Sequence, residues 1–192
     1  MRLLPKIFLA SLAICSGAAL CAKEKTHDET LILDAHRVII SVPEGFVFSS
    51  GRDEQGVLMA KITDAREKID LQVRFEADPT SRLGGEAQQM EFLATVCKQY
   101  AEGSVEKGYD FKPLEPHHGS GIYCAFTDAS LIGKQPVPRG EFLHITQGVK
   151  VSSGWVLVFT VLSNDITSKE YQTALKLVKD SFEEASAPGA KL

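Results

Sequence analysis

Residues 155–162 constrain the fold more than any other part of the sequence. They read Trp-Val-Leu-Val-Phe-Thr-Val-Leu, so an extended chain here carries apolar side chains on both faces. Such a strand is typical of the centre of a sheet, where both faces are covered. Ser153-Gly154 just before it favour a tight turn, so the run over 141–151 is predicted to pair with it as a hairpin.

Five further strands are predicted from short apolar runs. Over residues 68–77, apolar and polar side chains alternate, which is the period of a strand with one buried face. Turn signals such as Pro43-Glu44-Gly45 separate the runs. The predicted strands cover residues 36–42, 46–49, 57–63, 68–77 and 121–128, with Ile122, Cys124 and Phe126 on one face of the last.

Two segments have the period of a helix. The first spans about 85–102 and ends before Gly103, a typical helix stop; its apolar stripe consists of Met90, Leu93, Ala94, Cys97 and Ala101. The second follows Thr167-Ser168-Lys169-Glu170, which has the pattern of a capping box. Its apolar stripe consists of Tyr171, Ala174, Leu175, Val178 and Phe182.

The order strands, helix, strands, helix indicates an α+β fold, a mainly antiparallel twisted sheet covered by two main helices, and not the alternation of a doubly wound domain. One domain is expected over residues 31–184, a length that can bury a core without metals. Residues 23–30 are predicted to be a flexible lead-in, because they are charged and lack periodicity. Residues 185–192 are predicted to be a flexible tail.

Residues 1–22 have the pattern of a cleavable signal peptide. Arg2 and Lys6 precede an apolar stretch over 7–14, small residues lead to Ala22, and no acidic residue occurs before Glu24. Polar and small residues interrupt the apolar stretch, which disfavours a permanent membrane anchor. The predicted location is periplasmic or secreted. A lipid on Cys21 is an open alternative, although Leu20 directly before it fits a lipobox poorly.

The charge balance disfavours two classes of partner. The chain has 21 basic and 25 acidic residues, and removal of Arg2 and Lys6 leaves 19 against 25, a net charge of −6. No basic run or basic helix face is present. Because phosphate binding relies on clustered Lys and Arg, neither nucleic acid nor anionic lipid is an expected partner.

Only Cys97 and Cys124 lie outside the predicted leader, which contains Cys15 and Cys21. An even number of cysteines in an oxidising compartment favours a disulfide. The helix stripe and the sheet face that carry the two residues should pack together, so the bond would tie helix to sheet. It would close a loop of about 27 residues, for which chain entropy gives about 3.5 kcal/mol. Two buried free thiols are the alternative.

The sequence contains no local metal-binding motif such as Cys-x-x-Cys or His-Glu-x-x-His. His117 and His118 are neighbours in a loop rich in Pro and Gly, and neighbouring side chains of an extended chain point in opposite directions. We therefore expect solvent-exposed histidines here. No metal and no cofactor is predicted.

No catalytic motif is found either. Gly119-Ser120-Gly121 lacks the Gly-x-Ser-x-Gly spacing of a nucleophile elbow, and Gly84-Gly85 lacks the pattern of a phosphate loop. Cys97 lies on an apolar stripe, which argues against a reactive thiol. Carboxylates such as Asp34, Glu141 and Asp165 are scattered along the chain. No catalytic residue is predicted.

The order of elements resembles the PsbP-like family. The resemblance rests on a strand running into Val42-Pro43-Glu44-Gly45-Phe46, a long helix, a hairpin over 142–162 and a final helix ending Val178-Lys179-Asp180-Ser181-Phe182, and it covers residues 31–184. It implies an α/β/α sandwich. Members include an extrinsic photosystem subunit, a nuclear-import accessory that binds a GTPase, and bacterial periplasmic proteins and lipoproteins. The family implies action through protein partners without a shared active site.

The sequence therefore predicts an exported, non-catalytic accessory or binding domain that acts through a protein partner in the periplasm or cell envelope. The alternative is an envelope enzyme, hydrolase-like, whose site is assembled from residues distant in the sequence. A deep pocket with converging His and carboxylates would favour the enzyme. A flat sheet face would not.

Overall fold

The computed structural model describes residues 25–33, 36–78, 80–152, 154–181 and 183–185. The predicted signal peptide, Cys21, Asp34 and most of the predicted tail lie outside the described residues. Within the described residues, no helix has the length and apolar character that crossing a membrane requires.

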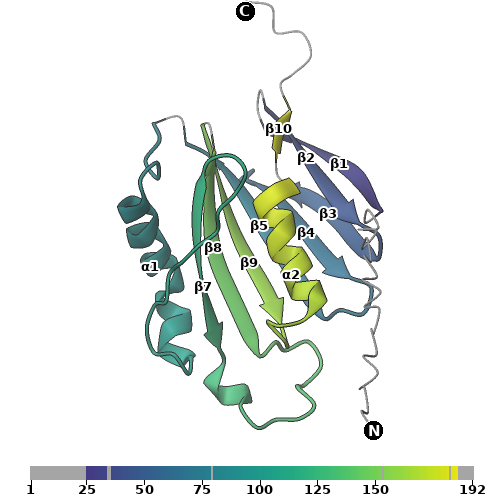
Figure 1. The fold of residues 1–192 in the computed structure, drawn as a ribbon, viewed down its shortest axis with the longest axis vertical. Coiled ribbons are helices and arrows are strands. Elements are labelled where there is room, and N and C mark those ends of the chain that lie inside the picture. Colours follow the sequence, from purple (N-terminus) through teal and green to yellow (C-terminus); the bar gives the residue numbers. More distant parts are fainter. Residues whose placement is uncertain (1–24, 34–35, 79, 153, 182, 186–192) are drawn as a thin grey trace, which may run out of the picture.

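A seven-stranded antiparallel sheet forms the centre of the structure (Figure 1), with the strand order β3-β4-β5-β9-β8-β7-β6. As predicted, β9 lies in the middle and forms a hairpin with β8, in which Ser152 pairs with Trp155. Gly154 has a φ of +81° at this turn, a conformation that favours glycine. The strands are β3 (Phe46–Arg52), β4 (Leu58–Asp64), β5 (Ile69–Ala77), β6 (Lys112–Pro113), β7 (Ser120–Thr127), β8 (His144–Ser152) and β9 (Trp155–Ser163).

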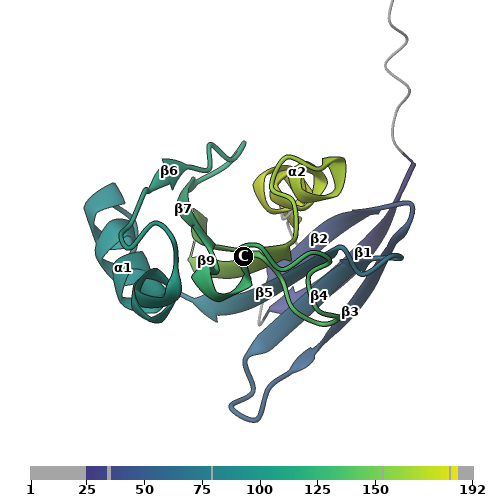
Figure 2. The same ribbon diagram turned by 90° about the horizontal axis from the view of Figure 1, so that it is seen from below.

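The two helices lie on different sides of this sheet (Figure 2). Alternate residues of β9 belong to different apolar clusters: Trp155, Leu157 and Phe159 pack with α2 (Lys169–Lys176), whereas Val156 packs with α1 (Glu86–Gly103). This division follows from the two-residue period of a strand. The α+β class and the two covering helices are thus as predicted.

On its side of the large sheet, α1 covers only the half that is formed by β7, β8 and β9. Its predicted stripe is largely correct, because Leu93, Cys97 and Ala101 are buried against Ile122 and other residues of these strands. On the same face, β3 and β4 carry exposed side chains, among them Val47. The large sheet therefore has an uncovered face beside α1.

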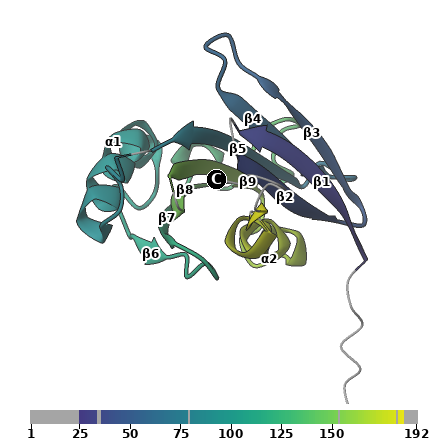
Figure 3. The ribbon, with the colours of Figure 1, turned by 90° about the horizontal axis from the view of Figure 1, so that it is seen from above.

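A three-stranded sheet of β1 (Thr26–Leu33), β2 (His36–Pro43) and β10 (Glu183–Ala185) lies next to α2 (Figure 3). Val38, Ile40 and Val42 of β2 are completely buried in the cluster that also contains residues of β4, β5 and β9. This small sheet and α2 together cover one face of the large sheet, and α1 covers half of the other.

Two expectations about the chain ends are corrected. The predicted flexible lead-in at 23–30 contains residues 26–30 of β1, and β10 includes Ala185 of the predicted tail. The start of β1 is polar, so nothing in its side-chain pattern indicates a strand. This segment is held by backbone pairing with β2, in which Thr26 lies opposite Pro43. Pairing of this kind depends on distant residues and leaves no local periodicity.

The start of the second helix lies one residue later than the capping box indicates. Ser168, and not Thr167, is the N-cap, and its Oγ accepts a hydrogen bond from the Tyr171 N–H at 3.2 Å. Thr167 instead bonds the carboxylate of Asp165, which accepts from its hydroxyl at 2.6 Å. Beyond Lys176 the helix continues as a π-helical turn, Leu177–Ser181.

We predict that Gly148 is essential for packing on the α2 face. A Cβ at this position of β8 would collide with the Phe159 ring and the Tyr123 side chain. Gly148→Ala should therefore lower the free energy of unfolding by about 1–3 kcal/mol, the usual cost of overpacking. Chemical denaturation measures this. Gly103→Ala is the matched control, because no atom lies within 4 Å of its added Cβ, and it should be close to neutral; equal losses in both variants would contradict the prediction.

Candidate functional site

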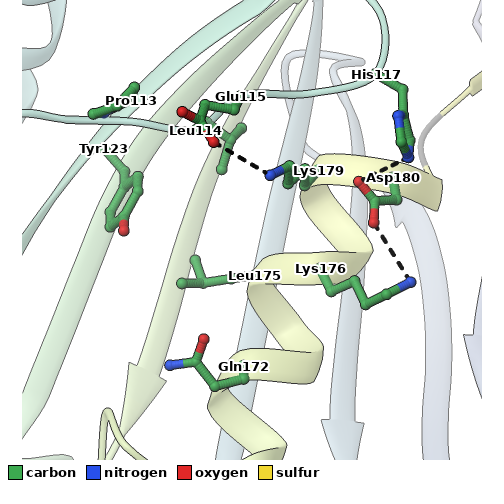
Figure 4. Close-up of a pocket in the computed structure, with 10 residues that line it drawn as sticks. All are labelled: Pro113, Leu114, Glu115, His117, Tyr123, Gln172, Leu175, Lys176, Lys179 and Asp180. Carbon is green, nitrogen blue, oxygen red and sulfur yellow. Dashed lines mark ion pairs between the residues drawn. The ribbon is translucent and has the colours of Figure 1, made fainter.

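A groove of about 580 Å³ lies between α2 with its π-helical turn and the segment that leads from β6 to β7 (Figure 4). Its wall residues come from two distant parts of the chain, residues 113–123 and 172–180. They are Pro113, Leu114, Glu115, His117, Tyr123, Gln172, Leu175, Lys176, Lys179 and Asp180.

Apolar side chains form one part of this groove. Tyr123 points away from α1 because its neighbours Ile122 and Cys124 point toward that helix, as strand alternation requires. Leu114 is buried, and Tyr123 and Leu175 are partly buried against the same cluster. The groove therefore offers a partly apolar surface.

Charged side chains form the rim. Lys179 Nζ lies 3.7 Å from Glu115 Oε2, Lys176 Nζ lies 3.4 Å from Asp180 Oδ2, and His117 Nε2 lies 3.6 Å from Asp180 Oδ1. The side chains of Glu115 and His117 are 75% and 67% exposed, so water screens their interactions. Asp180 is less accessible, at 19%. The rim thus displays both signs of charge to solvent.

The rim is held in place by β8. Lys150, only 2% exposed, donates from Nζ to the carbonyl oxygens of Val178 and Lys179 at 3.3 and 3.1 Å. A cation at these carbonyls also compensates the negative end of the helix. At the other end of α2, the Thr146 and Tyr171 hydroxyls are 2.8 Å apart. Two polar side chains of one strand therefore fix both ends of the groove's helical wall.

The groove lacks the parts of a nucleophilic site. Its described residues include no serine, threonine or cysteine. The His117 to Asp180 separation of 3.6 Å exceeds hydrogen-bond distance, so the carboxylate does not orient the imidazole. His117 is the one predicted loop histidine that lines the groove, and His118 does not. The arrangement places charged groups of both signs beside a partly apolar wall.

A second cluster of ionisable groups lies where α1 and the strands end. Glu106 accepts hydrogen bonds from the Thr127 hydroxyl at 2.8 Å and the Thr127 N–H at 2.9 Å, and Thr127 Oγ1 is 3.2 Å from His144 Nδ1. Burial lowers the pKa of His144, while the nearby charges of Glu106 and Asp165 act in the opposite direction. None of these four residues lines the groove. The cluster ties the end of α1 to the sheet.

The structure also places the remaining residues that the sequence analysis considered for catalysis. Ser120 Oγ accepts a hydrogen bond from the buried Gln89 side chain at 2.7 Å, and Gln89 also donates to the Leu83 carbonyl. Asp165 organises the turn before α2, and Glu141 is exposed. Among the described residues, no three His, Cys, Asp or Glu side chains are grouped to hold a metal ion.

Cys97 and Cys124 face each other between α1 and β7. Their sulfur atoms are 3.1 Å apart, and both residues are completely buried as free thiols. The contact with the Cys124 thiol, together with burial, raises the pKa of Cys97. The predicted packing of the helix stripe on the sheet face is confirmed. The disulfide itself stays a prediction.

We expect a Cys97 to Cys124 disulfide in protein recovered from an oxidising compartment. Denaturation in the presence of an alkylating agent, followed by intact-mass analysis, should find neither thiol modified until a reductant is added. The Cys97→Ala/Cys124→Ala double variant should lose about 3.5 kcal/mol of stability relative to the oxidised protein, from the loop that the bond closes. Alkylation of both cysteines without reductant would contradict the prediction.

We also predict a pH dependence that arises from His144. Its pKa in the folded protein lies below the unfolded value of about 6.5, so the unfolded chain binds more protons just below that pH. The resulting stability is fully present above pH 6.5 and is lost as the pH falls through this window. His144→Gln should flatten the profile of unfolding free energy between about pH 5 and 7. Profiles with the same slope in both proteins would show that His144 does not contribute.

No protein family and no curated protein matches this sequence. Among solved structures, the chain is similar to the solution structure of cyanobacterial PsbP (CyanoP) from Synechocystis sp. PCC 6803, with 15% identity and a TM-score of 0.49. The match covers 90% of this chain and 98% of that chain. It agrees with the predicted PsbP-like resemblance and concerns the fold alone.

Proposed function

We propose that this chain is an exported, non-catalytic accessory domain that binds a protein partner in the periplasm or cell envelope. The groove between α2 and the β6 to β7 segment is the binding site in this proposal. The observation that carries it is the combination of a partly apolar surface with a rim of exposed charges of both signs.

Features of the sequence support the location and the class of partner. The signal-peptide pattern at 1–22 supports export from the cytoplasm, and the acidic excess disfavours nucleic acid. A protein partner is the class that matches such a groove, because protein interfaces combine an apolar core with a polar rim. Lys176 and Lys179 project from one helix wall and can contact carboxylates of the partner.

The alternative, a hydrolase-like envelope enzyme, has one observation in its favour. His117 Nε2 and Asp180 Oδ1 lie 3.6 Å apart in the groove, and a histidine beside a carboxylate is a known arrangement for activating water. The high exposure of His117 and the absence of a hydrogen bond between the pair weigh against this role. We therefore place binding ahead of catalysis.

The binding proposal is tested with tagged protein expressed with its leader and cross-linked in cell envelopes. The wild type should enrich a specific protein. In the Lys176→Glu/Lys179→Glu variant, reversed rim charges should reduce that enrichment at least tenfold, which corresponds to about 1.4 kcal/mol of binding energy.

The matched control is Lys98→Glu/Lys134→Glu, which changes the net charge equally at two exposed positions away from the groove. It should bind like the wild type, and all three proteins should unfold at similar temperatures. Equal enrichment by the wild type and the groove variant would rule out this groove as the site. Specific enrichment of no protein at all would contradict the proposed function.

A further inference from the structure

β3 is an edge strand of the large sheet, paired with β4 on one side only (Figure 3). Among the described residues, none pairs with its outer backbone edge. An unpaired edge presents a row of N–H and C=O groups that can pair with another strand. The hydrogen-bond pattern identifies these groups.

The outward-pointing groups follow from the bonds at the two ends of the β3–β4 ladder. Ala65 donates its N–H to the Gly45 carbonyl, and Asp53 donates to the Val57 carbonyl. In an antiparallel pair, residues bonded to the neighbouring strand alternate with residues that point away. The odd-numbered residues of β3 therefore bond to β4. Phe46, Phe48, Ser50 and Arg52 present their backbone groups at the free edge.

Little on β3 discourages pairing. The strand contains no proline or lysine, and its one charged residue, Arg52, donates from its guanidinium to the carbonyl oxygen of Gly56 at 2.6 Å. Val47 is 60% exposed at this edge. β1, the edge of the small sheet, differs because it carries the adjacent acidic residues Asp28 and Glu29. Charges are a common protection of edge strands, and β3 has them only at its end.

We propose that a second copy of this chain pairs with β3, in antiparallel orientation, about a twofold axis through Ser49. In this register Phe46 pairs with Arg52 of the second copy, and Phe48 pairs with its Ser50. All four outward-facing residues are then used. A shift of two residues in either direction leaves some of these groups without partners. The two large sheets become one continuous sheet.

The side chains fit this register. Opposite residues of an antiparallel pair point to the same face, so Val47 lies beside Gly51 of the second copy. Gly51 borders a hollow of about 290 Å³ that is also lined by Ser49 and Met59. The exposed valine of each copy can enter the hollow of the other, which removes apolar surface from water. The twofold axis sets Ser49 against itself, and no like charges lie opposite each other within the strand.

Analytical ultracentrifugation of the purified protein tests the proposal, with Ser50→Pro as the main variant. Proline removes the outward N–H at position 50 without removing a β3–β4 bond, and it is tolerated at edges where the N–H faces solvent. The wild type should be a dimer that dissociates on dilution, and Ser50→Pro should be a monomer. Ser50→Ala, which keeps the N–H, should dimerise like the wild type.

Val47→Lys provides a second test that does not alter the backbone. A lysine at this exposed position should fold normally but bring charge into the hollow of the second copy, so it should also yield monomers. Hydrogen exchange should show slower exchange of the Phe48 and Ser50 amides as the wild-type concentration rises. The proposal would be overturned if the wild type stays monomeric up to about 1 mM. The free energy of association would then be weaker than about −4 kcal/mol. A dimer that persists in both Ser50→Pro and Val47→Lys would also overturn the proposal.

Discussion

The burial of β9 on both faces is the constraint on which the rest of the structure depends. Trp155, Leu157 and Phe159 face one apolar cluster and Val156 faces the other, so neither side of this strand can be left to water. The large sheet therefore needs a covering layer on each side at its centre. α1 supplies one layer, and α2 with the small sheet supplies the other. The groove and the uncovered β3–β4 surface are the places where these covers end.

β8 connects this core to the candidate site. On the face toward α2 it presents Thr146, Gly148 and Lys150 in succession. The first and last hold the two ends of the helical wall, through Tyr171 and through the carbonyl oxygens of the π-helical turn. Gly148 leaves room for the side chains of Phe159 and Tyr123, with which a Cβ at this position would collide. A strand with an interrupted apolar pattern thus positions the rim charges of the groove.

The elements predicted correctly from the sequence are those whose buried residues recur with the period of a strand or a helix. The alternation in β5 and the stripe of α1 translate directly into buried faces, and β9 is central as its composition requires. β1 was missed because its polar start is ordered by pairing with β2. The groove was missed because Tyr123, Leu175 and Lys179 come together only through the tertiary fold. The signal available in advance was Lys150, a lysine in the strand predicted to pair with the central strand, because a lysine that becomes buried there requires a partner.

The central claim is that the groove is where this protein meets a protein partner. Site-specific photo-cross-linking in living cells tests it most directly, with the photoreactive residue placed at Gln172 on the groove wall or at Gln88 on the exposed side of α1. Our account predicts one discrete cross-linked species from position 172 and none from position 88. No species from position 172, or the same species from both positions, would contradict it.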